Sequence, residues 1–130
     1  MGQEEEPKEI LVVDDDESIR QFLKGALTSS QRVVYTASNL QEAKAALNGH
    51  SIDLLLLDLY LPDGNGIKLL TETKEKPPTI VMTAFGGWET HVKAYNLGAF
   101  YYLDKPFKLS QLRILIDQAL RGRTTPESRC

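Results

Sequence analysis

Acidic residues follow directly after two apolar runs of the sequence, and their chemistry sets the first question. Asp14 and Asp15 come after Ile-Leu-Val-Val, and Asp58 comes after the four leucines at 54–57. Short, continuously apolar runs are typical of strands that are buried on both faces of a parallel sheet. Because the carboxyl ends of parallel strands meet at one edge, where α/β sheets bind ligands, we expect these carboxylates to lie together.

Carboxylates that lie together repel one another, so they either hold protons more tightly or recruit a cation. Oxygen ligands favour a hard divalent ion, most simply Mg²⁺. Thr83 and Lys105 end or follow two further apolar runs, and they add a hydroxyl donor and a fixed positive charge. Together with Mg²⁺ these groups can neutralise a transferring phosphoryl group. Asp58, alone at the end of its strand, is the candidate nucleophile that takes the phosphoryl as an acyl phosphate.

The elements that must position these residues alternate between strand and helix along the chain. Such strict alternation predicts an α/β fold, a parallel sheet with helices on both faces. Asp16 is the predicted N-cap of the first helix, and Ser38 with Gln41 forms a capping-box signature for the second. The predicted strands are residues 10–13, 33–36, 54–57, 79–83 and 100–103, and the predicted helices are residues 17–27, 39–48, 67–76, 88–97 and 111–120.

Composition places the chain among globular proteins and excludes several other classes. Its 130 residues suit one compact domain at 9–121, with a flexible lead-in at 1–8 and a linker or disordered tail at 122–130. The net charge of -3 gives no electrostatic case for nucleic-acid binding. No apolar run approaches the roughly 20 residues that cross a membrane. The polar N-terminus is unlike a signal peptide, and the one cysteine, Cys130, forms no intrachain disulfide, so we expect a cytoplasmic location.

Four motifs occur in order along the chain: Val12-Val13-Asp14-Asp15-Asp16, Asp58-x-x-x-Pro62-Asp63-x-x-Gly66, Val81-Met82-Thr83-Ala84 and Lys105-Pro106-Phe107. With these motifs the chain resembles the receiver domain of bacterial two-component response regulators over nearly its whole length. Within that family it is most similar to receivers of nitrogen-regulation-type transcription activators. The resemblance implies a flavodoxin-like (βα)5 three-layer sandwich whose five-stranded parallel sheet has the order 2-1-3-4-5. It also implies a cis Lys105–Pro106 bond, which X-Pro bonds permit at modest cost.

The resemblance also implies roles for individual residues. Asp58 would be the phosphoacceptor, and Asp15, Asp58 and the Tyr60 carbonyl would bind Mg²⁺ directly, with Asp14 bound through water. Thr83 and the Ala84 amide would bind the phosphoryl oxygens, and Lys105 would pair with their charge. Tyr102 would be the switch aromatic, whose ring turns inward when Thr83 moves toward the phosphoryl group.

The implied function is a phosphorylation-dependent signalling switch rather than an enzyme, because the domain would catalyse only its own phosphorylation and dephosphorylation. A sensor histidine kinase would be its partner. Trp88, Tyr95 and Tyr101 are the candidate interface residues of a homodimer through the fourth helix and fifth strand. An output domain, which we expect to control transcription, would follow the C-terminus.

Two other functions stay open at this point. A receiver-like module could bind a partner without phosphorylation, although all the chemical residues are present. A phosphohydrolase of the haloacid-dehalogenase type also combines an aspartate, Mg²⁺, threonine and lysine, and Asp14-x-Asp16-x-Ser18 superficially fits its nucleophile motif. That class needs a further acidic pair after the lysine, and the last predicted helix offers only Asp117. It would also leave Asp58 without a role.

Overall fold

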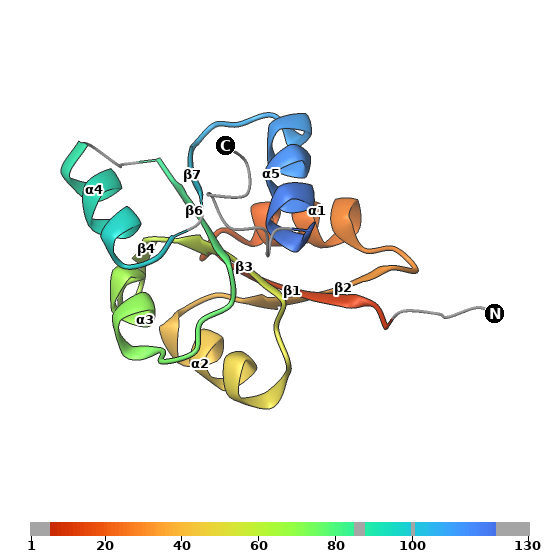
Figure 1. Ribbon diagram of the computed structural model, residues 1–130, viewed down its shortest axis with the longest axis horizontal. Helices are drawn as coiled ribbons and strands as arrows, with labels where there is room; N and C mark the ends of the chain where they lie inside the picture. The colour runs from red at the N-terminus through yellow and green to blue at the C-terminus, as the bar shows by residue number, and fades with distance from the viewer. Residues whose placement is uncertain (1–5, 85–87, 100, 122–130) are drawn as a thin grey trace.

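The computed structural model describes residues 6–84, 88–99 and 101–121, and it describes only the backbone of Trp88, Thr90 and His91. A five-stranded parallel sheet of order β2-β1-β3-β6-β7 forms the centre of the molecule (Figure 1). Its strands are β1 (Lys8–Val13), β2 (Arg32–Ala37), β3 (Leu54–Asp58), β6 (Thr79–Thr83) and β7 (Tyr101–Asp104). A separate antiparallel hairpin of β4 (Tyr60–Leu61) and β5 (Gly64–Asn65) follows β3. The helices are α1 (Glu17–Leu27), α2 (Leu40–Gly49), α3 (Ile67–Glu72), α4 (Trp88–Asn96) and α5 (Leu109–Arg121).

Counting only the strands of the central sheet, this order is 2-1-3-4-5, so the predicted flavodoxin-like topology is confirmed. Helices α1 and α5 lie on one side of the sheet, and α2, α3 and α4 lie on the other (Figure 1). The small hairpin was not predicted. The Lys105–Pro106 bond is cis, as predicted.

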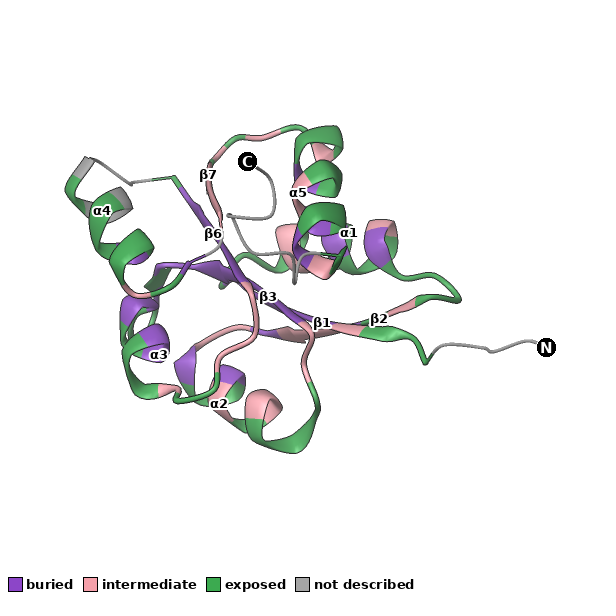
Figure 2. Cartoon of the chain, viewed as in Figure 1, coloured by how far each residue is buried: buried purple, intermediate pink, exposed green. Residues whose placement is uncertain are grey.

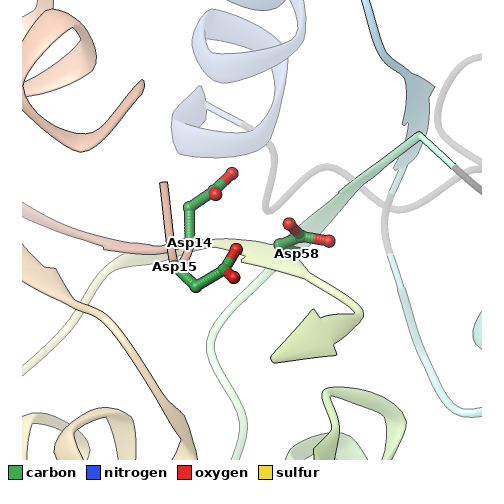
Figure 3. A group of neighbouring side chains, drawn as sticks. All are labelled: Asp14, Asp15 and Asp58. Atoms are coloured by element: carbon green, nitrogen blue, oxygen red, sulfur yellow. The ribbon is translucent and has the colours of Figure 1, made fainter. Parts of the chain in front are cut away.

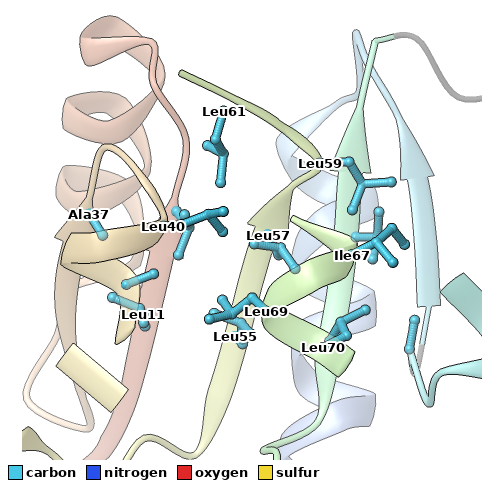
Figure 4. Packing of buried hydrophobic residues seen from close by; sticks show 14 of the residues in the cluster. Leu11, Ala37, Leu40, Leu55, Leu57, Leu59, Leu61, Ile67, Leu69 and Leu70 are labelled. Carbon is cyan, nitrogen blue, oxygen red and sulfur yellow. The ribbon is translucent and has the colours of Figure 1, made fainter. Parts of the chain in front are cut away.

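The leucines of β3 explain why this strand is central. Leu54 and Leu56 pack into the cluster under α1 and α5, while Leu55 and Leu57 pack into the cluster under α2, α3 and α4. All four are fully buried, and the inner strands of the sheet are buried along most of their length (Figure 2). Since both faces of the strand are covered, both sets of alternating side chains must be apolar. Figure 4 shows the second of these clusters.

The helix starts agree only in part with the predicted caps. The Asp16 carboxylate accepts a hydrogen bond from the Ile19 N–H at 3.2 Å, as expected of an N-cap. The predicted Ser38–Gln41 capping box is wrong, because Asn39 caps α2 and accepts from the Glu42 N–H at 2.8 Å. Glu42 in turn accepts from the Ser38 N–H at 2.7 Å. The two capping roles therefore fall one residue later than predicted.

Other boundaries differ or stay predictions. Helix α3 ends at Glu72, earlier than the predicted end at residue 76, and β1 already begins at Lys8. The predicted lead-in and tail fall mostly outside the described residues, so the limits of the domain remain a prediction. Within the described part of the chain, no helix has the length and apolar character needed to span a membrane.

Candidate functional site

Three carboxylates lie together where β1 and β3 end. Asp14 and Asp15 follow β1, and Asp58 is the last residue of β3. One carboxylate oxygen from each of the three lies within 4.8 Å of the others, and Figure 3 shows the three side chains side by side. Asp14 is fully buried and Asp58 is 6% exposed, whereas Asp15 is exposed. The cluster is therefore held by the sheet and open to solvent through Asp15.

Lys105 brings a positive charge to two of these carboxylates. Its Nζ lies 2.6 Å from Asp14 Oδ2 and 3.1 Å from Asp58 Oδ2. The Lys105 backbone N–H donates to the Thr83 carbonyl at 2.9 Å, which ties the residue to the end of β6. Thr83 itself is fully buried, and Ala84, the next residue, is exposed. Residues separated by up to 91 positions thus meet at one edge of the sheet.

At both Asp58 and Lys105, burial and charge interactions shift the pKa in opposite directions. Burial raises the pKa of Asp58, although hydrogen bonds from the Tyr60 N–H and from Lys105 partly offset it. Burial alone would lower the pKa of Lys105, but its hydrogen bonds and charge interactions with Asp14 and Asp58 outweigh that effect and raise it. Lys105 therefore stays charged at neutral pH. Any further positively charged group in the site would stabilise the ionised form of the Asp58 carboxylate.

Three hydrogen bonds that involve the backbone fix Asp14 at the end of β1. Asp14 Oδ1 accepts a hydrogen bond from the Asp16 N–H at 3.0 Å. The Arg20 guanidinium donates to the Asp14 carbonyl at 2.8 Å, and the Asp14 N–H donates to the Ala37 carbonyl at 3.1 Å. Sequence reasoning missed Arg20, because a single arginine one turn into an amphipathic helix is ordinary. Its contact is visible only once the helix is placed.

Gly66 supports the backbone of Asp58 from the other side. Its N–H donates to the Leu59 carbonyl at 2.7 Å. A Cβ atom at this position would lie only 2.7 Å from the Asp58 carbonyl oxygen, so a larger residue would displace the backbone that carries the carboxylate. Asp58 Oδ1 also accepts from the Tyr60 N–H at 3.1 Å. Lack of space for a side chain thus explains why the last position of the Pro-Asp-x-x-Gly motif is glycine in this chain.

The donor set fits a hard divalent cation. Three carboxylates with neighbouring oxygens, one of them exposed, are the ligand type that Mg²⁺ prefers. Both oxygens of Asp14 already accept hydrogen bonds, from Asp16 and from Lys105, which agrees with the expectation that Asp14 binds the ion through water. Tyr60 lies two residues after Asp58, at the start of the hairpin. The individual ligand roles remain predictions.

The predicted switch residue, Tyr102, lies in β7, which pairs with β6. Tyr102 is half-buried and packs against the cluster under α2, α3 and α4. Burial raises its pKa to about 12, with smaller contributions from Asp104 and Tyr60. This phenol is therefore neutral at physiological pH.

The predicted interface residues lie in different surroundings. Tyr95 of α4 is 76% exposed. Tyr101 of β7 is half-buried, and its hydroxyl donates to Gln118 Oε1 on α5. The side chain of Trp88 lies outside the described residues. Among the aromatic side chains that the structure describes, Tyr95 is the most exposed.

An apolar groove of about 400 Å³ opens beside the site. It is lined by Ile19, Phe22 and Leu23 of α1, by Ala84 after β6, and by Lys105, Pro106 and Phe107 after β7. Phe22 is 58% exposed, which is high for a phenylalanine on a packed helix. A partner that rests in this groove would therefore lie next to Lys105 and Asp58.

Comparison with known proteins matches residues 10–117 to the response regulator receiver domain. The chain is 40% identical over 114 residues to the DNA-binding transcriptional regulator NtrC of Proteus hauseri, covering 85% of this chain and 24% of that protein. A two-component response regulator from Clostridium difficile has a similar structure, with a TM-score of 0.85, 29% identity, and coverage of 91% of this chain and 99% of that one. The beryllofluoride-activated NtrC4 receiver domain dimer matches with a TM-score of 0.79 and 33% identity, over 87% of this chain and 96% of that one.

The chain spans about a quarter of the length of NtrC and PilR, two of the relatives it matches. The family model, in contrast, covers most of this chain, including every strand end that carries the carboxylates, Thr83 and Lys105. The fold, the strand order and the relatives agree with one another. The chain belongs to the receiver domain family of response regulators.

Proposed function

We propose that this chain is the phosphorylation-operated switch of a two-component system, with Asp58 as the phosphoacceptor. The observation that carries the proposal is the cluster of Asp14, Asp15 and Asp58 around Lys105 at the edge of the sheet. A buried carboxylate with a raised pKa, beside a charged lysine, is a candidate nucleophile in a site suited to anionic groups.

The proposed reaction transfers a phosphoryl group from a kinase phosphohistidine, or from a small phosphodonor, to Asp58. A carboxylate oxygen of Asp58 attacks the phosphorus and forms an O–P bond, while the bond from phosphorus to the leaving group breaks. With phosphohistidine this is the P–N bond, and its electron pair stays on the imidazole nitrogen, which takes a proton from solvent. With acetyl phosphate it is a P–O bond, and its electron pair stays on the departing acetate. Mg²⁺ held by Asp15, Asp58 and the Tyr60 carbonyl, with Asp14 through water, would offset the negative charge of the phosphoryl oxygens.

Three residues of the chain would serve the phosphoryl group once it is on Asp58. The Thr83 hydroxyl and the Ala84 amide donate hydrogen bonds to its oxygens, and the Lys105 ammonium pairs with their charge. Lys105 now contacts both Asp14 and Asp58, so it can follow the new negative charge over a short distance. The domain thus catalyses only its own phosphorylation and dephosphorylation.

The switch works by differential binding, because the phosphoryl group stabilises the arrangement in which Thr83 approaches it. Movement of Thr83 changes the space next to Tyr102, whose ring packs on the neighbouring strand. The face of α4 and β7, with Trp88, Tyr95 and Tyr101, is the output surface. The similarity to a receiver that is a dimer when activated by beryllofluoride supports pairing of two copies, which we assign to this face.

The partners follow from the same arrangement. A sensor histidine kinase would place its phosphohistidine beside Asp58 by resting an apolar helix in the groove next to Lys105. This chain covers only 24% of the relative named as the DNA-binding transcriptional regulator NtrC, which supports our proposal that an output domain follows the receiver. Nucleic-acid binding then belongs to the output domain, and the receiver acts in the cytoplasm.

Intact-mass measurement with acetyl phosphate tests the proposal. Wild-type protein should gain one phosphoryl group in the presence of Mg²⁺, and it should gain none with a chelator or in Asp58→Asn. No mass gain in any condition would instead favour a binding module that works without phosphorylation. Turnover of a phosphomonoester that survives Asp58→Asn would favour a phosphohydrolase.

A further inference from the structure

We propose that Asp63 is a positioning residue, which clamps the β4–β5 hairpin onto the first turn of α2 and thereby fixes the Tyr60 carbonyl. This inference rests on the proposed function, in which that carbonyl is a ligand of Mg²⁺. Asp63 itself touches neither the metal site nor the phosphoryl group. Its effect would pass through the hairpin that it holds.

The clamp consists of two hydrogen bonds between distant parts of the chain. Asp63 Oδ1 accepts from the Leu40 N–H at 2.8 Å, and Oδ2 accepts from the Gln41 N–H at 3.1 Å. Both donors belong to the first turn of a helix, where backbone N–H groups have no partner within the helix. These bonds also lower the pKa of Asp63, so the carboxylate is ionised at neutral pH. A carboxylate is favoured at this end of the helix dipole.

The β4–β5 hairpin connects the turn that contains Asp63 to Tyr60 and Asp58 at the site. Tyr60 pairs with Asn65 and Leu61 pairs with Gly64, so only Pro62 and Asp63 form the turn. At the base of the hairpin, the Tyr60 N–H donates to Asp58 Oδ1 at 3.1 Å. Tyr60 therefore lies between two anchors, Asp58 at the base and Asp63 at the tip.

Apolar contacts support the same attachment. A Cβ atom on Gly64 would lie 2.9 Å from Leu40 Cδ1, so the hairpin and the start of α2 are in close contact. Gly64 has a φ of 146°, which also favours glycine. Leu61 belongs to the same buried cluster as Leu40, and the two lie near each other in Figure 4.

Helix α2 has a side-chain cap of its own at Asn39, and Asp63 accepts from the Leu40 and Gln41 N–H groups, which this cap does not reach. Asn39 caps the Glu42 N–H at 2.8 Å, and Glu42 reaches back to Ser38. The strand before α2 ends at Ala37, whose carbonyl accepts from the Asp14 N–H at 3.1 Å. The clamp therefore joins the loop after Asp58 to the segment that also holds Asp14.

The test compares Asp63→Ala and Asp63→Asn with Asn39→Ala, each in the full chain. Asn39→Ala removes a cap of the same helix without touching the hairpin, so it is the matched control. Mg²⁺ affinity is measured by titration calorimetry, and thermal unfolding is recorded alongside it. Asp63→Ala should weaken Mg²⁺ binding about ten-fold, the lower end of the effect of residues that orient metal ligands. Asp63→Asn keeps one acceptor and should fall between Asp63→Ala and wild type.

Asn39→Ala should lower the unfolding temperature and leave the Mg²⁺ affinity within about two-fold of wild type. Amide hydrogen exchange should speed up at residues 60–65 in Asp63→Ala but not in Asn39→Ala. Equal Mg²⁺ affinities in both alanine variants would reduce Asp63 to a helix cap and overturn the inference while leaving the proposed function intact. Wild-type protein that binds no Mg²⁺ would overturn both.

If Asp63→Ala does not fold, Asp63→Asn takes its place in the comparison with Asn39→Ala, and equal Mg²⁺ affinities of those two variants would overturn the inference in the same way.

Discussion

Burial makes the ionised form of Asp58 less favourable, and the hydrogen bonds from Tyr60 and Lys105 only partly offset this effect. Burial raises the pKa of Asp58, so the folded protein holds this proton more tightly than the unfolded chain does. A raised pKa adds stability that is complete below the pKa of the unfolded chain and is lost as the pH rises through the folded value. The ionised form of Asp58 therefore favours folding less than the protonated form does.

We predict that Asp58→Asn raises the free energy of unfolding at pH 7, without Mg²⁺, by on the order of 1 kcal/mol. The gain should shrink toward pH 3, below the usual aspartate pKa of about 3.9. Urea unfolding at both pH values measures this effect, with the exposed Glu75 as control through Glu75→Gln, which should change little at either pH. A variant that is less stable at pH 7, or a gain that does not depend on pH, would contradict the assignment.

Gly66 gives a second prediction at the scale of single residues. Its φ of -59° suits any residue, so the cost of Gly66→Ala comes from close approaches, above all to the Asp58 carbonyl oxygen and also to Leu59 Cα and Leu57 Cδ1. We expect a loss of about 1–3 kcal/mol in stability, typical of overpacking, and slower phosphorylation by acetyl phosphate. Gly25→Ala is the control, because nothing lies within 4 Å of a Cβ there and the position is inside α1. That control should gain about 0.5–1 kcal/mol and keep its phosphorylation rate.

At the scale of elements, α1 offers a test of how the kinase approaches. Phe22 is 58% exposed and lines the groove beside Lys105, whereas Tyr95 is 76% exposed on α4 and is not part of that groove. Phe22→Ser should slow phosphotransfer from the cognate histidine kinase about ten-fold, as truncation of an interface aromatic does. Tyr95→Ser should leave this rate unchanged. Both variants should react with acetyl phosphate at the wild-type rate, and a Phe22→Ser defect with both donors would contradict a docking role.

The elements also show what the sequence could and could not predict. The leucines at 54–57 predicted a strand buried on both faces, and this was correct because helices cover both faces of β3. The parallel order of the strands then brings Asp14, Asp58 and Lys105 to the same edge of the sheet. The β4–β5 hairpin was missed, since strands of two residues show no periodicity. The partners of Asp63 were missed for another reason. They lie 22 and 23 residues away, and a turn aspartate looks the same with or without them.

Helix caps were predicted correctly in one of two cases. The predicted role of Asp16 at the start of α1 was confirmed, although Asp15 and Ser18 beside it are also good capping residues. Ser38 and Asn39 are both good caps, and Gln41 and Glu42 both suit the third helical position, so the sequence pattern fits either register. The structure selects Asn39, with Ser38 hydrogen-bonded to Glu42.

For the whole molecule, we predict a change of assembly when the site is filled. Beryllofluoride with Mg²⁺ mimics the phosphoryl group, and light scattering after gel filtration should then report a dimer. Tyr95→Ser should reduce this pairing, because Tyr95 is a highly exposed aromatic residue of α4. Phe22→Ser, on the helix away from α4, should pair like wild type. Equal loss in both variants, or none in Tyr95→Ser, would exclude the α4 and β7 face as the dimer interface.

Mapping of the modified residue decides whether Asp58 forms the acyl phosphate. The protein is phosphorylated by acetyl phosphate with Mg²⁺, the acyl phosphate is reduced with borohydride, and the altered residue is located by peptide mass spectrometry. We predict a single modified position, Asp58, and no modification in Asp58→Asn. Modification of Asp14 or Asp15, or a wild-type level of modification in Asp58→Asn, would contradict the proposed function of the site.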